Sequence, residues 1–156
     1  GGLIHLVMNM MAVRNLAPVT ADIIGPSRTV IVYVVAGVFG FLLSTYMGVG
    51  ITIGASASIC GLIGALIHYG RRSGSRLIYN QALQWAISTL LLGFIVPVIN
   101  NWAHLGGFIG GYLVSMALNP LTREKGDHML IAAISLVVSI GAVLYAIIDH
   151  WSRIFS

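Results

Sequence analysis

The sequence predicts an all-α protein, a polytopic membrane helix bundle with about six transmembrane helices. Of its 156 residues, 58% are hydrophobic and only 8% are charged, and the mean hydropathy is +0.95. Soluble domains carry about 25% charged residues, so these values exclude an ordinary soluble globule. The 19 glycines agree with the membrane class, because glycine is more frequent in spanning helices than in soluble ones.

Six apolar segments, separated by short polar or glycine-rich breaks, are the expected helices. They cover residues 3–16, 29–47, 56–70, 77–96, 102–118 and 129–151. We expect the first to end before Pro18, because proline usually stops a helix. The third has about fifteen residues, which reach only about 22 Å and fall short of a bilayer core of about 30 Å. The whole chain, 1–156, is read as a single membrane domain.

The distribution of Lys and Arg predicts the orientation of the bundle. By loop parity seven of the eight basic residues share one side, and Arg153 lies on the other. The seven are Arg14, Arg28, Arg71, Arg72, Arg76, Arg123 and Lys125. Because basic loops stay in the cytoplasm, the end near residue 1 is expected to face outward. Since Gly1 enters an apolar run without a basic leader, we also expect a further span upstream.

Several other classes of protein are disfavoured. The net charge of +4 comes from basic residues scattered over loops, so nucleic-acid binding is not expected. The single cysteine, Cys60, excludes an intrachain disulfide framework and a multi-cysteine metal site. No metal and no cofactor is expected, and the oligomeric state is left open. The expected location is an integral position in a membrane, with a bacterial inner membrane as the default.

Polar side chains recur at one depth in three of these segments. His5 and Asn9 lie one turn apart in the first, Ser56 opens the third, and His104 lies in the first turn of the fifth. Because all three segments begin on the outer side, we expect these side chains within one or two turns of the outer surface. Such residues are costly inside a membrane and are often functional. Taken singly, each also fits an interhelical hydrogen bond or a helix cap.

This set contains the parts of a serine hydrolase. A serine becomes nucleophilic when a nearby histidine takes its proton, so Ser56 is the expected nucleophile and His104 the expected base. Gly54 permits a sharp turn into the third helix, whose free N-terminal amides can face an anion. The amide of Asn9 is an uncharged donor for the developing oxyanion. No Asp or Glu is expected at this depth, so we predict a Ser-His dyad without an acid.

Small residues at four-residue spacing allow the third and fifth helices to approach closely. The third contains Ala57-x-x-x-Gly61-x-x-x-Ala65, and the fifth contains Gly107-x-x-x-Gly111, where Gly106 and Gly110 widen the smooth face. Generic packing of spanning helices explains the same pattern. We expect the two helices to pack together and to bring Ser56 near His104.

Three motifs in this order resemble those of the rhomboid family of intramembrane serine proteases. They are His5-x-x-x-Asn9, Gly54-Ala-Ser56-Ala and Ala103-His104-Leu-Gly-Gly107. The resemblance implies a rhomboid-like fold, with Ser56 as nucleophile and His104 as base. It assigns His5 and Asn9 to the oxyanion hole. It also implies cleavage of the transmembrane segments of other membrane proteins near their outer ends.

The resemblance covers residues 1–119, the expected catalytic core, and 129–151 would be an extra C-terminal transmembrane helix. Two residues depart from the family pattern. Ala57 stands where the family usually has glycine, and its methyl group either crowds the oxyanion hole or is tolerated. Cys60 stands where an aromatic residue commonly packs against the catalytic histidine. The family's first span and the Trp-Arg motif after it do not occur here.

Three functions remain open at this stage. The first is an active intramembrane serine endopeptidase in which the segment 77–96, ending at Pro97, acts as a substrate gate. The second is a catalytically inactive rhomboid-like protein that binds transmembrane clients. The third is a small transporter or channel, for which Asn9 would matter and Ser56 would not. The lipid bilayer is a partner in all three.

Overall fold

The structure is a computed structural model that describes the backbone of residues 2–96 and 99–155 and side chains as far as Trp151. Within this part of the chain it contains six helices and no strand. They are α1 (Leu3–Ile24), α2 (Pro26–Tyr46), α3 (Ser56–Ser73), α4 (Arg76–Ile95), α5 (Asn101–Leu118) and α6 (Gly126–Phe155). The all-α prediction and the order of the helices are confirmed. Pro97 and the side chain of Arg153 lie outside the described residues.

The first helix is longer than the sequence predicts, because Pro18 lies inside α1 and not after it. Beyond the proline, Thr20 and Ile24 are buried against the bundle, and the Thr20 hydroxyl donates to the carbonyl of Leu16 at 2.8 Å. Tertiary packing and side-chain hydrogen bonds compensate for the backbone bond that proline removes in a membrane helix. Arg14 therefore lies halfway along α1, exposed, and not near the end of the first helix, where the expected range 3–16 places it.

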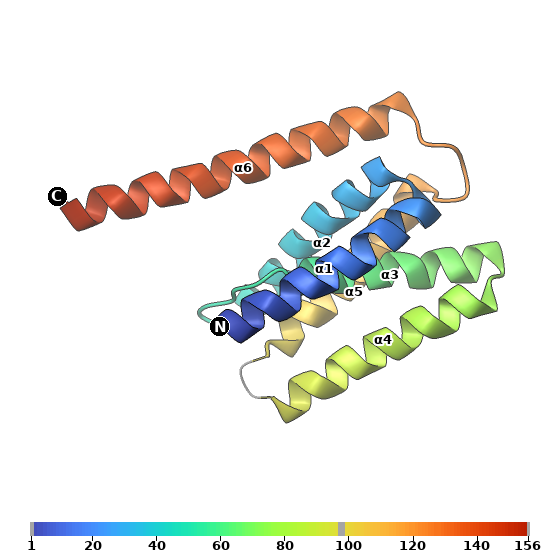
Figure 1. Cartoon of the computed structure of the whole chain (residues 1–156), viewed down its shortest axis with the longest axis horizontal. Coiled ribbons are helices and arrows are strands. Elements are labelled where there is room, and N and C mark those ends of the chain that lie inside the picture. Colours follow the sequence, from blue (N-terminus) through green and yellow to red (C-terminus); the bar gives the residue numbers. More distant parts are fainter. Residues whose placement is uncertain (1, 97–98, 156) are drawn as a thin grey trace.

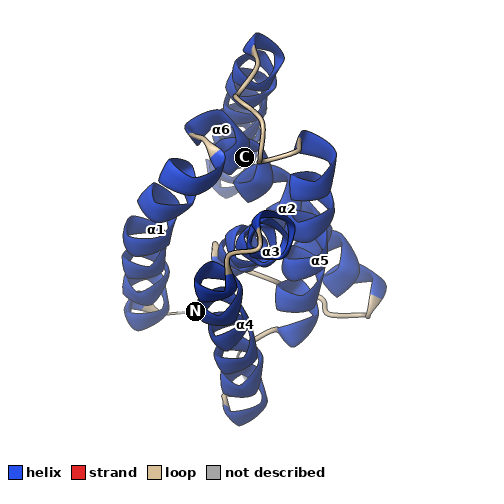
Figure 2. Cartoon of the chain, turned by 90° about the vertical axis from the view of Figure 1, so that its right-hand side faces the viewer, coloured by secondary structure: helices blue, strands red, loops and turns tan. Residues whose placement is uncertain are grey.

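The central helix is α3, which Figure 2 shows surrounded by α1, α2, α4 and α5. The predicted end at Gly70 was three residues short, since α3 continues to Ser73 and a left-handed Gly74 follows it. Gly70 instead packs on α4, where a methyl group at this position would lie 2.6 Å from the backbone nitrogen of Tyr79. The 18 residues of α3 span about 27 Å, which is still short of a bilayer core.

The helices alternate in direction, as loop parity predicts. In Figure 1, α1, α3 and α5 begin at one end of the bundle, and α2, α4 and α6 end there. We call this the site end, because it holds Ser56 and His104. The hydrophobic core between the helices is formed by Leu16, Ile24, Val32, Cys60, Leu62, Ile63, Ala65, Leu66, Ala82, Ala86 and Phe108.

The last helix stands apart from the other five. Among the described helices, α6 contacts only α2, and in Figure 1 it extends past the rest of the molecule at its C-terminal end. Within the described residues, α2 and the stretch Gly126–Trp151 are the two helices that are long and apolar enough to cross a membrane by themselves. Most large side chains of α6 are exposed, as expected of a helix that faces lipid.

The start of α2 is joined to the α5–α6 linker at the opposite end of the bundle. Arg28 is 2% exposed, and its guanidinium donates to the Thr122 hydroxyl and the Arg123 carbonyl, each at 3.2 Å. The backbone nitrogen of Arg28 donates to the Glu124 carboxylate at 2.8 Å. These bonds fix the point from which α6 leaves the bundle.

Candidate active site

The four predicted polar side chains line one cavity at the site end. His5 and Asn9 reach it from α1, Ser56 from α3 and His104 from α5, and its volume is about 400 Å³. The rest of its wall is mainly apolar and includes Met8, Ala12, Ile59, Cys60, Leu92 and Ile99. No Asp or Glu belongs to the described lining of this cavity. The fold thus brings together residues that lie about fifty positions apart in the sequence.

Ser56 is the first residue of α3, and the turn before it is made by glycine. Gly54 has φ +108°, a backbone conformation that residues with a side chain rarely adopt. The N-cap residue Ala55 forms no side-chain cap, so the first amides of α3 have no side-chain acceptor. Free amides at a helix N-terminus favour a bound anion. The serine hydroxyl therefore stands beside donors that suit a developing negative charge.

His104 is held in the first turn of α5 and is 4% exposed. Its Nδ1 atom is buried and has no hydrogen-bond partner within the described part of the chain. Ser56 and His104 share the cavity wall without a hydrogen bond between them. In unliganded enzymes such bonds are often long and tighten only around the substrate, so the shared cavity is the relevant geometry here.

His5 and Asn9 face the same cavity with unpartnered polar atoms. One N–H of the Asn9 amide donates to the backbone carbonyl of His5 at 2.8 Å, so one N–H remains for a ligand. The amide oxygen of Asn9 and the Nε2 atom of His5 are buried without a partner among the described residues. A second cavity, of about 590 Å³, adjoins these two side chains and reaches Tyr33 of α2. The pair therefore stands between two cavities.

Gly107 and Gly111, which are predicted to serve helix packing, lie where α3 and α5 meet, and Gly61 adjoins both α5 and Ala36 of α2. A methyl group at Gly107 would collide with the backbone of Ala57, and one at Gly111 with the backbone of Gly61. Gly106 and Gly110 do not widen this contact, because they face another helix. A methyl group at Gly106 would lie 2.8 Å from the carbonyl oxygen of Phe39, and one at Gly110 would lie 2.7 Å from the Cβ of the same residue. α5 thus packs closely on α3 and on α2 at once.

The two departures from the family motifs affect the cavity differently. Ala57 is 2% exposed and lies outside the cavity lining, with its methyl group against Gly40 of α2 and its backbone against Gly107 of α5. It does not crowd the space next to Ser56. Cys60 does line the cavity, one turn below Ser56. A small thiol there leaves room that an aromatic ring would fill.

Three further polar residues at the site end are not indicated by any motif in the sequence. They are Ser44 at the end of α2, Thr52 in the α2–α3 loop and Asn100 at the N-cap of α5, and their side chains hydrogen bond to one another. The Asn100 side chain also accepts from the backbone nitrogens of Trp102 and Ala103. An asparagine just before a helix is a capping signal, and that signal alone could have drawn attention to Asn100.

Comparison with known proteins agrees with this arrangement. The chain is 29% identical over 150 residues to the Rhomboid protease GluP of Bacillus subtilis (strain 168), a match that covers 94% of this chain and 30% of that protein. It is 33% identical over 123 residues to RHOMBOID-like protein 7 of Arabidopsis thaliana, covering 75% of this chain and 39% of that protein. The chain is 32% identical over 124 residues to Rhomboid-like protease 5 of Toxoplasma gondii, covering 75% of this chain and 15% of that protein.

This chain spans well under half the length of each of these relatives. The family model described as Rhomboid domain matches residues 1–121, which include α1 to α5 and every residue of the cavity described above. The match ends before α6. Because it covers most of the chain, the protein belongs to the rhomboid family.

Proposed function

We propose that this chain is an intramembrane serine endopeptidase that cleaves the transmembrane segments of other membrane proteins. The observation that carries the proposal is the single cavity of about 400 Å³ lined by Ser56, His104, His5 and Asn9. Family membership and the apolar helices make the chain an integral membrane protein. We assign the catalytic core to residues 1–119, an additional transmembrane helix to 129–151, and the site end to the extracytoplasmic side.

In the proposed reaction, the Ser56 hydroxyl attacks a peptide carbonyl while His104 takes its proton. The oxyanion is stabilised by the first amides of α3, the remaining N–H of Asn9 and the imidazole of His5. His104 then gives the proton to the leaving amine, and water hydrolyses the acyl-enzyme. No acid is needed to orient the histidine, since its ring is held by burial in the first turn of α5.

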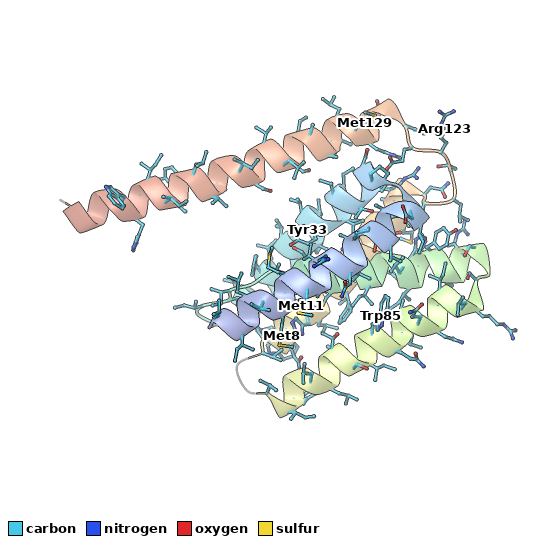
Figure 3. The ribbon with its side chains drawn as sticks, viewed as in Figure 1. Met8, Met11, Tyr33, Trp85, Arg123 and Met129 are labelled. Atoms are coloured by element: carbon cyan, nitrogen blue, oxygen red, sulfur yellow. The ribbon has the colours of Figure 1, made fainter. Side chains whose placement is uncertain are left out.

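A substrate helix would enter between α1 and α4. Both helices contribute to the cavity wall, with Met8 and Ala12 from α1 and Thr89 and Leu92 from α4, yet no two Cα atoms of their described residues lie within 8 Å of each other. In Figure 3, Met8 lies on the side of α1 nearer to α4. The apolar wall suits a segment that arrives from lipid. This supports α4 as the substrate gate.

Covalent labelling with a fluorophosphonate probe tests the activated serine. The purified chain, in detergent, is compared with Ser56→Ala, His104→Ala and the matched control Ser58→Ala. Ser58 is on the same turn of α3 but packs against Gly37 of α2, outside the cavity lining. We expect the wild type and Ser58→Ala to label, and the Ser56 and His104 variants to lose labelling.

Two other outcomes separate the alternatives. A folded wild-type chain that neither labels nor cleaves a tagged single-span substrate in vesicles, but retains that substrate on purification, is an inactive binder of transmembrane clients. Labelling that persists in Ser56→Ala contradicts the assignment of the nucleophile. Cleavage of the substrate by the wild type and not by Ser56→Ala supports the endopeptidase.

A further inference from the structure

The side chain of Asn100 connects three segments at the site end. Its amide nitrogen donates to the Ser44 hydroxyl at 2.5 Å and to the Thr52 hydroxyl at 2.8 Å. The two hydroxyls lie 2.6 Å apart and form a hydrogen bond of their own. At its other end the amide oxygen caps α5, accepting from the backbone nitrogens of Trp102 and Ala103 at 3.1 and 3.2 Å. Both the nitrogen and the oxygen of the Asn100 amide are therefore hydrogen bonded.

Two members of this network lie next to the proposed catalytic residues. Thr52 precedes Ser56 by four residues, and Asn100 precedes His104 by four. Thr52 and Asn100 also line the same cavity as the pair. The backbone nitrogen of His104 donates to the carbonyl of Asn100 at 3.2 Å, so the position of Asn100 fixes the turn that carries the histidine.

The loop before Ser56 has few side-chain hydrogen bonds to hold it. Residues 47–55 include three glycines, which are conformationally permissive. Thr52 is the only residue of this loop with a polar side chain, so its hydroxyl forms the loop's only side-chain hydrogen bonds. Ser44, the anchor of the network on α2, is fully buried. Hydrogen bonds in such a low-dielectric setting hold their partners firmly, and breaking one leaves a costly unpaired group.

We propose that Asn100, with Thr52 and Ser44, is a positioning device that holds the Ser56 loop against the start of α5 and so sets the serine relative to the histidine. This inference rests on the proposed protease function. Asn100 and Thr52 are positioning residues and not catalytic ones. Because a displacement of about 1 Å of a reacting group costs about a hundredfold in rate, losing the network should slow the chemistry and leave substrate binding intact.

The test is the fluorophosphonate reaction measured over a range of probe concentrations, which separates the maximal labelling rate from the half-saturating concentration. Thr52→Val keeps the shape of the side chain and removes the hydroxyl, whereas Thr52→Ser keeps the hydroxyl. Thr20→Val is the matched control, because Thr20 is a buried threonine whose hydroxyl bonds within α1. Thermal unfolding of each variant is followed in the same detergent.

We expect Thr52→Val to lower the maximal rate about ten- to a hundredfold at an unchanged half-saturating concentration, with Thr52→Ser close to wild type. Thr20→Val should label at the wild-type rate although it loses a comparable hydroxyl. If Thr52→Val does not fold, Asn100→Ser serves instead, since serine still caps α5 but is too short to reach Ser44 and Thr52.

The outcomes distinguish this inference from the proposed function beneath it. A wild-type chain that is folded and does not label overturns both. A wild type that labels, together with a Thr52→Val or Asn100→Ser variant that labels at the same rate, overturns the positioning role alone. The same holds if Thr52→Val and Thr20→Val slow labelling equally, because the effect would then follow general stability.

Discussion

Gly54 lies directly against the imidazole of His5, so close that a methyl group built at the glycine would collide with Nε2. This contact joins the loop before Ser56 to the first helix. It also explains two features of the candidate motifs at once. The glycine supplies the left-handed backbone before α3, and its missing side chain leaves space for a histidine ring that lines the cavity.

Gly54→Ala should therefore damage the site through both the backbone and the ring. Gly48→Ala separates the two effects, because Gly48 also has a positive φ, +79°, but nothing lies within 4 Å of a methyl group there. We expect each variant to lose about 1 kcal/mol of unfolding free energy from backbone strain. Only Gly54→Ala should also lower the rate of fluorophosphonate labelling, by tenfold or more. Equal labelling rates in the two variants would contradict the role of the His5 contact.

Close packing of α3 on α5 gives a second prediction. Gly111→Ala inserts a methyl group into the backbone of Gly61, and overpacking of this kind costs about 1–3 kcal/mol. Gly141→Ala in α6 is the control, because a methyl group there meets nothing within 4 Å and alanine favours a helix by about 1 kcal/mol over glycine. Unfolding in mixed detergent micelles should show a lower free energy of unfolding for Gly111→Ala and no loss for Gly141→Ala. An unchanged free energy of unfolding in Gly111→Ala would show that α3 and α5 can move apart without loss of stability.

The sequence predicts the number, order and direction of the helices because hydropathy and loop parity are local signals. The spacing of small residues also indicates that α3 and α5 approach closely. The same spacing does not say which neighbour each glycine meets, and this is why Gly106 and Gly110 were assigned to the wrong interface. Neighbouring glycines on one helix can face two different helices, and only tertiary structure separates them.

Ser44, Thr52 and Asn100 are polar and lie at helix ends or in loops, where polar residues usually face solvent, so the sequence does not mark them as part of the site. Ser44 and Asn100 are 56 residues apart, and no local pattern connects them. The end of α1 was missed for a related reason. The local signal of Pro18 is overridden by the burial of Thr20 and Ile24, which depends on contacts with other helices.

A second serine and histidine pair provides a third prediction and tests whether proximity alone makes a site. His68 of α3 and Ser115 of α5 hydrogen bond at 3.0 Å, both are buried, and the histidine ring packs edge-on against Tyr112 at 5.1 Å. Neither residue lines the described cavities at the site end. The pair is therefore expected to stabilise the fold without reacting.

Ser115→Ala should lower the unfolding free energy by about 1–3 kcal/mol, because it leaves a buried ring nitrogen without its partner. Labelling at Ser56 should continue at an unchanged rate below the unfolding temperature. Ser139→Ala is the control, since among the described residues that hydroxyl bonds only to the carbonyl of Ser135 in its own helix. If Ser115→Ala abolishes labelling while the protein stays folded, the pair has a role in the reaction.

The Arg28 cluster gives a last prediction, at the end of the bundle opposite the site. Arg28→Met removes three guanidinium hydrogen bonds, including those to Thr122 and Arg123 in the linker before α6. Because hydrogen bonds to a charged group contribute about 1.5–3 kcal/mol each, the linker should open locally far more often. Figure 3 shows the Arg123 side chain projecting away from the bundle, where trypsin can reach it once the backbone is released.

We expect cleavage after Arg123 to accelerate by at least about tenfold, separating α6 from an otherwise folded α1–α5 bundle that still labels. Arg76→Met, at an exposed position on α4, should leave the cleavage rate of the linker unchanged, and a similar acceleration in that variant would show that the cluster does not hold the linker.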